Sequence, residues 1–202
     1  MIITTKKSDK EILDSVKDAK TVFLVNCLDC AKSCGTGDDK AVAAVTALLE
    51  ANGKTVLGSK GIDSVCDERL SKRDLLKDEN FAEADAILIL ACGSGVQSVE
   101  SISQKNVVPA LDSGFPGVTE RIGVYKKFCG VCGGECILAL TGTICPKTRC
   151  PKGLVNGPCG GFANGKCETD PNKDCAWVLI YEKLKKNGKL ERFLNQYIEP
   201  KK

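Results

Sequence analysis

The chain of 202 residues contains no histidine. This absence excludes a histidine ligand for catalytic zinc, a histidine general base and a histidine that activates a cysteine or serine nucleophile. Aromatic residues make up only 5% of the chain, which argues against a stacking surface for single-stranded nucleic acid. The charge is nearly balanced, with 29 lysines and arginines against 26 aspartates and glutamates, so no broad basic field indicates nucleic-acid binding.

Long apolar runs are also missing. No stretch reaches the length of about 18 residues that a membrane-spanning helix needs. Residues 1–20 are charged and lack the apolar core and cleavage site of a secretory signal. We therefore expect a cytoplasmic protein with neither a membrane nor a nucleic acid as its partner. In that compartment thiols stay reduced, and clustered cysteines are ligands more often than disulfides.

Cysteine, in contrast, is abundant, with thirteen residues. An odd number leaves at least one thiol outside any scheme of pairs or tetrads. The cysteines fall in ordered clusters, which favours metal binding over disulfide bonds. The candidate metal ligands are Cys27, Cys30, Cys34, Cys66, Cys92, Cys129, Cys132, Cys136, Cys145, Cys150, Cys159, Cys167 and Cys175.

The first half of the chain alternates short β-branched runs with helical patterns, which predicts an α/β domain with a parallel sheet of the flavodoxin or Rossmann-like kind. Strands are expected at residues 21–27, 54–58, 86–92 and 107–112. Capping residues mark the expected helix starts: Ser8 with Glu11, Asp38, Ser64, and Ser94 with Gln97. The second of these helices is expected to end at Asn52 and Gly53.

Beyond Asp112 the run SGFPGVTER breaks the regular periodicity, so we place an α/β domain at residues 1–120 and a second domain at residues 121–202. The second domain is expected to be small, cysteine-rich, loop-dominated and metal-binding, with C-terminal helices. Asp174 is the expected cap of a helix that ends at residues 187–188, and a last helix is expected at residues 190–198. Trp177 is interpreted as a core residue.

The first ligand loop has the spacing C-x2-C-x3-C and contains Cys27, Cys30 and Cys34. Such a loop supplies three thiolates to three corners of a [4Fe-4S] cluster, and the fourth arrives from elsewhere in the fold. Ligands in parallel α/β sheets collect at the C-terminal ends of strands. Cys92, at the end of the third expected strand, is therefore the first choice for the fourth ligand, and Cys66 is the alternative.

The same spacing returns in the second half at Cys129, Cys132 and Cys136, and five further cysteines follow. Eight thiolates suit two cubane clusters or two tetrahedral zinc sites. The sequence does not fix how the eight divide between sites. We expect two or three [4Fe-4S] clusters in the chain, with zinc as the alternative in the second domain.

The run TGTICPKTRCPKGLVNGPCGG, continuing through GKCE to CAWVLIYEKLKKNGKL, resembles the C-terminal domain of the small subunit of two-subunit methylenetetrahydrofolate reductases from anaerobic acetogenic bacteria. The segments VNCLDCAKSCGTGDD and LACGSGVQSVE resemble the N-terminal half of that subunit. The resemblance implies a partner, a flavin-containing barrel subunit that holds FMN and reduces methylenetetrahydrofolate to methyltetrahydrofolate. It also implies that the thirteen cysteines carry metal centres, described in the family both as zinc and as iron-sulfur.

Taken together, the residues and the resemblance predict an iron-sulfur electron-transfer subunit with no catalytic residues of its own. It would relay electrons from ferredoxin or another donor to the partner's flavin. The alternative is a structural zinc-binding subunit that docks to the catalytic subunit and stabilises it. A third hypothesis, a redox sensor with exposed C-x2-C pairs, does not account for so many further cysteines.

Overall fold

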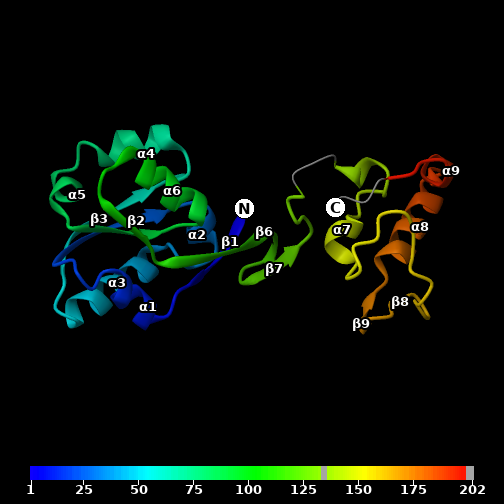
Figure 1. Ribbon diagram of the computed structural model, residues 1–202, viewed down its shortest axis with the longest axis horizontal. Helices are drawn as coiled ribbons and strands as arrows, with labels where there is room; N and C mark the ends of the chain where they lie inside the picture. The colour runs from blue at the N-terminus through cyan, green and yellow to red at the C-terminus, as the bar shows by residue number, and fades with distance from the viewer. Residues whose placement is uncertain (133–135, 199–202) are drawn as a thin grey trace. The chain divides into compact units, whose positions relative to one another are not determined.

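The structure is a computed structural model that describes residues 1–132 and 136–198. The chain forms two compact units, Met1–Lys126 and Lys127–Lys202. The first is an α/β unit and the second consists mainly of loops with short helices (Figure 1). We describe each unit by itself.

A four-stranded parallel sheet with the order β3-β2-β4-β5 forms the centre of the first unit. Its strands are β2 (Thr21–Cys27), β3 (Thr55–Ile62), β4 (Ala86–Leu90) and β5 (Asn106–Pro109). The helices of this unit are α1 (Asp9–Ser15), α2 (Cys30–Ser33), α3 (Asp39–Ala51), α4 (Glu68–Leu75), α5 (Glu79–Glu83) and α6 (Gly93–Ile102). Figure 1 shows α1 and α3 on one face of the sheet and α4, α5 and α6 on the other. The expected parallel α/β fold is confirmed.

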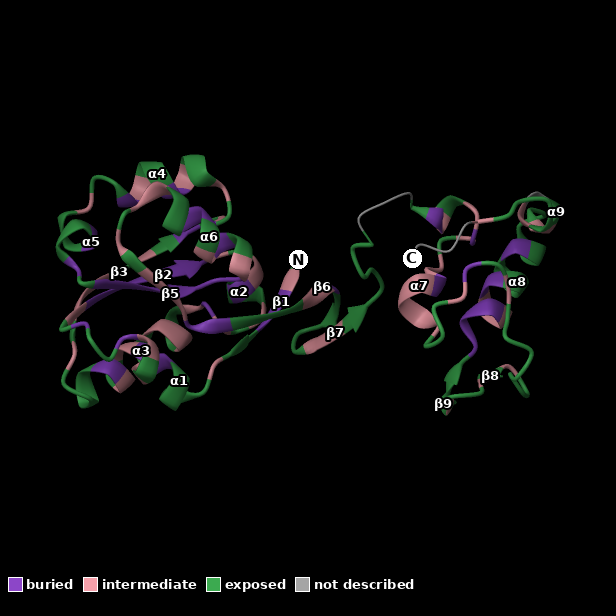
Figure 2. Cartoon of the chain, in the orientation of Figure 1, coloured by how far each residue is buried: buried purple, intermediate pink, exposed green. Residues whose placement is uncertain are grey.

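Burial follows from this layered arrangement. All five residues of β4 are buried, because the strand is central and covered on both faces (Figure 2). Six of the seven residues of β2 are buried for the same reason. In the edge strand β3 only the last residue, Ile62, is buried, and the others are exposed or partly buried.

Two of the expected helix caps are confirmed and two are wrong. Ser8 and Glu11 form a capping box at α1, and the Asp38 carboxylate accepts a hydrogen bond from the Ala41 N–H at α3, which ends at Asn52 as expected. Asp67, not Ser64, caps α4. At α6 the cap is Cys92, not Ser94, because the chain turns into the helix directly from the end of β4.

A second, antiparallel sheet with the order β1-β6-β7 was not expected. It contains β1 (Ile2–Lys6), β6 (Leu111–Arg121) and β7 (Val124–Lys127). The expected strand at residues 107–112 is therefore two strands in two sheets, and the expected loss of regularity after Asp112 is wrong. The pairing with β1 requires a glycine at position 117. A Cβ atom there would lie 2.4 Å from the Ile3 side chain on β1, so a larger residue would not fit.

The second unit contains η1 (Ile137–Ala139), α7 (Pro146–Arg149), β8 (Lys166–Cys167), β9 (Asp170–Asp174), α8 (Ala176–Lys186) and α9 (Leu190–Leu194). Cys175, not Asp174, is the N-cap of α8, because Asp174 is the last residue of β9. The last helix ends at Leu194, four residues before the expected end.

The buried core of the second unit is small. It consists of Cys175, Trp177, Ile180 and Leu184, with partly buried apolar side chains around it. The Trp177 indole N–H donates to the Leu154 carbonyl at 3.0 Å, and its ring lies 5.2 Å from that of Phe193. The assignment of Trp177 to the core is confirmed.

Candidate metal centres

The first ligand loop begins at the end of β2. Cys27 is the last residue of that strand, Cys30 is the first residue of α2 and Cys34 is its C-cap. Cys92 follows the neighbouring parallel strand β4 and caps α6. β2 and β4 are the two strands between which the strand order reverses, which is where α/β sheets bind ligands. The fold therefore brings these four cysteines to one end of one strand pair.

Backbone groups of β1 contact this loop. The Ile2 N–H donates a hydrogen bond to the Cys30 Sγ atom at 3.4 Å, and the Cys34 thiol contacts the Ile2 carbonyl at 3.9 Å. The Tyr125 hydroxyl donates to the Ser33 carbonyl at 2.9 Å. Burial raises the pKa of the Cys30 thiol, and the Ile2 N–H acts in the opposite direction. The β1-β6-β7 sheet thus covers the loop and supplies a donor to sulfur.

Cys66 is more exposed than Cys27, Cys30, Cys34 and Cys92. It is exposed in the turn between β3 and α4, and its sulfur lies 3.3 Å from the Ser64 hydroxyl oxygen. Cys92, in contrast, is buried. The order of preference for the fourth ligand, Cys92 before Cys66, stays a prediction.

The eight cysteines of the second unit line two separate hollows, four in each. The first tetrad, Cys129, Cys132, Cys136 and Cys145, surrounds a hollow of about 130 Å³. The second tetrad, Cys150, Cys159, Cys167 and Cys175, surrounds one of about 20 Å³. This division follows chain order, which spacing alone did not fix.

Hydrogen-bond donors approach the sulfur atoms of the first tetrad. Lys147 Nζ lies 3.8 Å from Cys132 Sγ, and the Thr148 hydroxyl lies 3.5 Å from Cys145 Sγ. The Val131 N–H donates to Cys129 Sγ at 3.5 Å. Lys147 and Thr148 belong to α7, which begins directly after Cys145 with Pro146 at its first position. The short helix therefore places a cation and a hydroxyl beside the thiols.

A carboxylate lies beside the second tetrad. The Cys159 thiol donates to Glu168 Oε2 at 3.1 Å, and Lys152 Nζ pairs with the same oxygen at 2.9 Å. The hydrogen bond from Lys152 is the largest cause of the lowered pKa of Glu168, followed by the hydrogen bond from Cys159. At Cys167, hydrogen bonding with Thr169 lowers the pKa of the thiol.

The donor set fits a thiolate-bound metal or cluster. All thirteen cysteines are free thiols, and four sulfurs without nitrogen or oxygen ligands are typical of structural zinc and of iron-sulfur clusters. Within residues 1–132 and 136–198, however, no three Cys, Asp or Glu side chains lie together closely enough to hold a single ion. The thiols line hollows and do not converge on a point.

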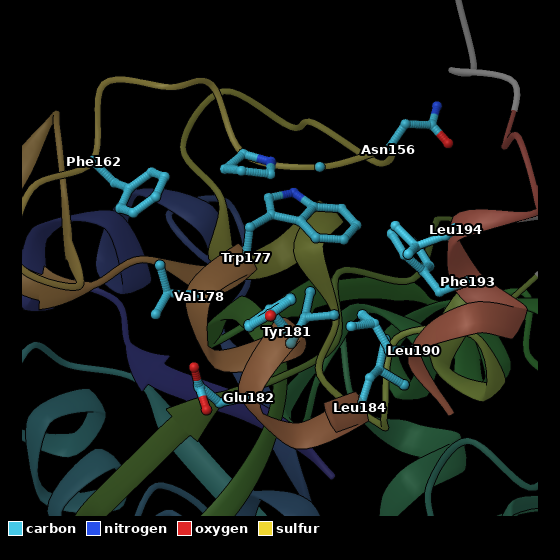
Figure 3. A pocket seen from close by; sticks show the side chains of 13 residues that line it. Asn156, Phe162, Trp177, Val178, Tyr181, Glu182, Leu184, Leu190, Phe193 and Leu194 are labelled. Carbon is cyan, nitrogen blue, oxygen red and sulfur yellow. The ribbon is translucent and has the colours of Figure 1, made fainter. Parts of the chain in front are cut away.

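A third hollow of the second unit is lined by no cysteine. It is an apolar groove of about 500 Å³ between α8, α9 and the loop that contains Asn156. Figure 3 shows Trp177 and Tyr181 of α8 facing Leu190 and Leu194 of α9 across it. Leu194 keeps 69% of its surface exposed. The sequence predicts only a terminal helix at residues 190–198 and gives no sign of this groove.

The polar neighbours Lys147, Thr148 and Glu168 were also missed. The run CPKTRC carried a signal for Thr148 alone, because this residue follows Cys145 by three positions, a spacing at which helical residues are neighbours. The contact of Lys147 is with Cys132, 15 residues earlier in the chain. No comparable signal marked Glu168, whose contact with Cys159 spans nine residues of loop.

The fold and the cysteines define a class of protein in which an α/β unit is followed by a cysteine-rich C-terminal unit. Residues 108–202 match the family model described as "Methylene-tetrahydrofolate reductase C terminal". The match covers just under half of the chain and supports a relationship to a methylenetetrahydrofolate reductase subunit. No curated protein and no solved structure matches the chain. No helix in the described part of the chain is long and apolar enough to cross a membrane.

Proposed function

We propose that this chain is an iron-sulfur electron-transfer subunit of a methylenetetrahydrofolate reductase. One observation carries the proposal: the region that matches the reductase family contains two hollows, each lined by four cysteines. Iron-sulfur clusters are held by thiolates in this number, and when bound they supply one-electron transfer.

In this proposal, residues of this chain bind the clusters and adjust their reduction potentials. The first tetrad offers four thiolates, and Cys27, Cys30, Cys34 and Cys92 offer a further set at the edge of the parallel sheet. N–H groups and cations that point at sulfur stabilise the more negative, reduced state and so raise a reduction potential. The Ile2 N–H would do so for a cluster bound by Cys30, and Lys147 would do so for one bound by Cys132.

The reduction of the folate itself belongs to the partner in this proposal. The chain has no histidine for acid-base chemistry. Two single electrons, delivered by ferredoxin or a similar donor, would pass to the FMN of the barrel subunit, and the reduced flavin would then transfer a hydride to methylenetetrahydrofolate.

The apolar groove is the surface that we assign to the partner subunit. Its volume lies within the range of about 300–1,000 Å³ that is common for binding pockets. Lys183, Lys185, Lys186 and Lys189 follow along α8 and its end, all exposed, and no salt bridge in the described part of the chain includes them. A partner segment with apolar side chains flanked by acidic residues would complement this surface.

The test uses anaerobically purified full-length chain together with a flavin-containing reductase subunit. We expect Cys30→Ala and Cys132→Ala to lower bound iron and acid-labile sulfide and to slow the bleaching of the flavin by reduced ferredoxin. Ser59→Ala, an exposed change on β3, serves as the control. Unchanged iron and an unchanged rate in both cysteine variants would rule out the proposal.

A structural zinc-binding function is the second candidate. Cys175 favours it, because this ligand candidate is also one of the four buried residues of the core around Trp177. A metal held there would tie the loops to α8. The metal content measured in the same experiment separates the two functions.

A further inference from the structure

Two apolar side chains are exposed on the loop that contains Cys129 and Cys132. Phe128 keeps 40% of its surface exposed, and Val131 keeps 67%. Val131 also has a φ of 50°, in the left-handed region, where a β-branched residue is an outlier. Backbone strain of this kind clusters at active sites and ligand-binding segments. The loop therefore presents a candidate contact surface.

Two cations of α7 border these side chains. The Arg149 guanidinium lies 4.7 Å from the centre of the Phe128 ring, and Lys147 Nζ lies 3.8 Å from Cys132 Sγ. Among residues 1–132 and 136–198, no salt bridge includes Lys147 or Arg149. Arginine and aromatic residues are both enriched in protein–protein interfaces, so this pair fits a docking surface.

Charge is distributed unevenly between the two units. Residues 127–202 contain 13 lysines and arginines against 7 aspartates and glutamates, whereas residues 1–126 contain 16 against 19. A positive excess attracts acidic partners and accelerates their association. We propose that Phe128, Val131, Lys147 and Arg149, together called the α7 face, form the docking surface for a small acidic electron-carrier protein.

The α7 face differs from the surface that we assign to the flavin-containing subunit. None of its four residues lines the apolar groove. Encounters between redox proteins bury little surface, which allows the carrier to leave after each transfer, so a small face suits a donor. Phe128 and Lys147 also line the hollow of the first tetrad. A carrier bound here would lie beside the centre that the proposed function places there, and its identity as an electron donor rests on that function.

The test measures two affinities of the anaerobically purified full-length chain, one for a bacterial ferredoxin and one for the flavin-containing subunit. Two matched charge reversals are compared, Arg149→Glu on the α7 face and Lys189→Glu at the N-cap of α9. We expect Arg149→Glu to weaken ferredoxin binding about tenfold at low salt and to leave the binding of the flavin-containing subunit unchanged. Lys189→Glu should do the reverse. Equal effects of the two variants on ferredoxin binding, or no effect of Arg149→Glu, would overturn the inference.

The dependence on salt separates the charge from the apolar contact. The loss of affinity in Arg149→Glu should shrink as the ionic strength rises from about 0.05 M to about 0.5 M, because salt screens exposed charges. Val131→Ser removes exposed apolar surface and no charge, so its smaller loss should be the same at both ionic strengths. A loss in Arg149→Glu that does not change with salt would contradict an electrostatic docking surface.

Because Arg149→Glu can disturb the packing on Phe128, two milder variants accompany it. Arg149→Lys keeps the charge, whereas Arg149→Gln removes it without adding a carboxylate. Arg149→Lys should bind ferredoxin more tightly than Arg149→Gln. The same affinity in these two variants would overturn the role of the charge.

The docking inference and the proposed function fail in different ways. Normal reduction of the flavin by ferredoxin, with an affinity that does not depend on Arg149, would overturn the docking surface and leave the electron-transfer function standing. Ferredoxin binding that depends on Arg149, in a chain that holds no iron and passes no electrons to the flavin, would support the docking surface and overturn the electron-transfer function. Binding of the flavin-containing subunit that depends on Arg149 would assign the α7 face to that subunit and overturn the inference.

Discussion

The two units of this chain achieve order by different means. In the first unit, 25 buried residues form one apolar cluster around the parallel sheet. In the second, the cluster has four buried residues, and most of the remaining described residues are exposed or partly buried. A unit of fewer than 80 residues with so small a core needs another source of stability, and metals commonly provide it. If the cysteines of the second unit bind metal, as we propose, this binding would compensate for the small number of buried apolar residues.

Of the changes considered, the removal of metal should produce the largest difference in stability between the two units. Structural zinc contributes on the order of 10 kcal/mol to the folding of small domains, because no site exists in the unfolded chain. After treatment with a strong chelator under anaerobic conditions, amide hydrogen exchange of residues 136–198 should become fast. The amides of β2 and β4 should keep their protection, since apolar burial holds them. Protection that persists in both units would show that the second core is sufficient alone.

The stability of the first unit should depend instead on the apolar side chains buried around its parallel sheet. Leu88 is fully buried in the middle of β4, so Leu88→Ala leaves a cavity and should cost about 3 kcal/mol in the free energy of unfolding of the first unit. Urea denaturation followed by circular dichroism measures this loss. The metal content that we propose for the second unit should not change.

Leu76→Ala is the matched control for that measurement. Leu76 is the C-cap of α4 and has 54% of its surface exposed, so its truncation should change the free energy of unfolding little. Equal losses in the two variants would contradict a stability that depends on burial in the first unit.

The strands of the parallel sheet could be predicted well from the sequence, because their apolar residues are the ones that the fold buries. The run AILIL is apolar throughout, and it forms the central strand β4. β6 was missed because Gly114, Pro116 and Gly117 are rare inside strands, and only the close approach to Ile3 of a segment 110 residues away makes them suitable. Tertiary contact, not local preference, determines that strand.

The candidate sites show the same limit. The three-cysteine loops were visible in the sequence because their ligands are neighbours. The division of the eight cysteines was not, because it depends on how loops with several left-handed glycines, among them Gly153, Gly157 and Gly160, fold back on themselves. A pattern of spacing predicts a donor set, whereas the hollow that the donors surround is a property of the fold.

The two units should also differ in partner binding, because we assign the binding surface to the apolar groove of the second unit. Leu194→Asp places a charge on its wall and should weaken binding to the flavin-containing subunit about tenfold or more, because the carboxylate would be desolvated in the complex. Surface plasmon resonance with the immobilised partner measures this change. Leu76→Asp, an equivalent change on the first unit, should bind normally, and equal weakening by both variants would remove the groove from the interface.

A smaller effect is expected at the first helix. Ser8→Ala removes the hydroxyl that accepts from the Glu11 N–H, and with it half of the capping box of α1. Such a loss costs about 1 kcal/mol of stability. It should appear as a lower urea midpoint for the first unit, whereas a lower midpoint for the second unit would indicate that the two units unfold together.

The smallest effect concerns acid. Hydrogen bonds from the Arg69 guanidinium, and then from its backbone N–H, lower the pKa of Asp67 to about 2. Since the folded pKa lies below the ordinary value of 3.8, the contribution of Asp67 to stability is present above that value and is lost as the pH falls toward about 2. Asp67→Asn should therefore unfold at a slightly lower temperature than the parent at neutral pH, and the two should converge near pH 2. Thermal scans of the first unit from pH 2 to pH 7 measure this difference. A gap that stays constant with pH would mean that Asp67 acts as a neutral cap of α4, through its hydrogen bond from the Arg69 N–H, and not through its charge.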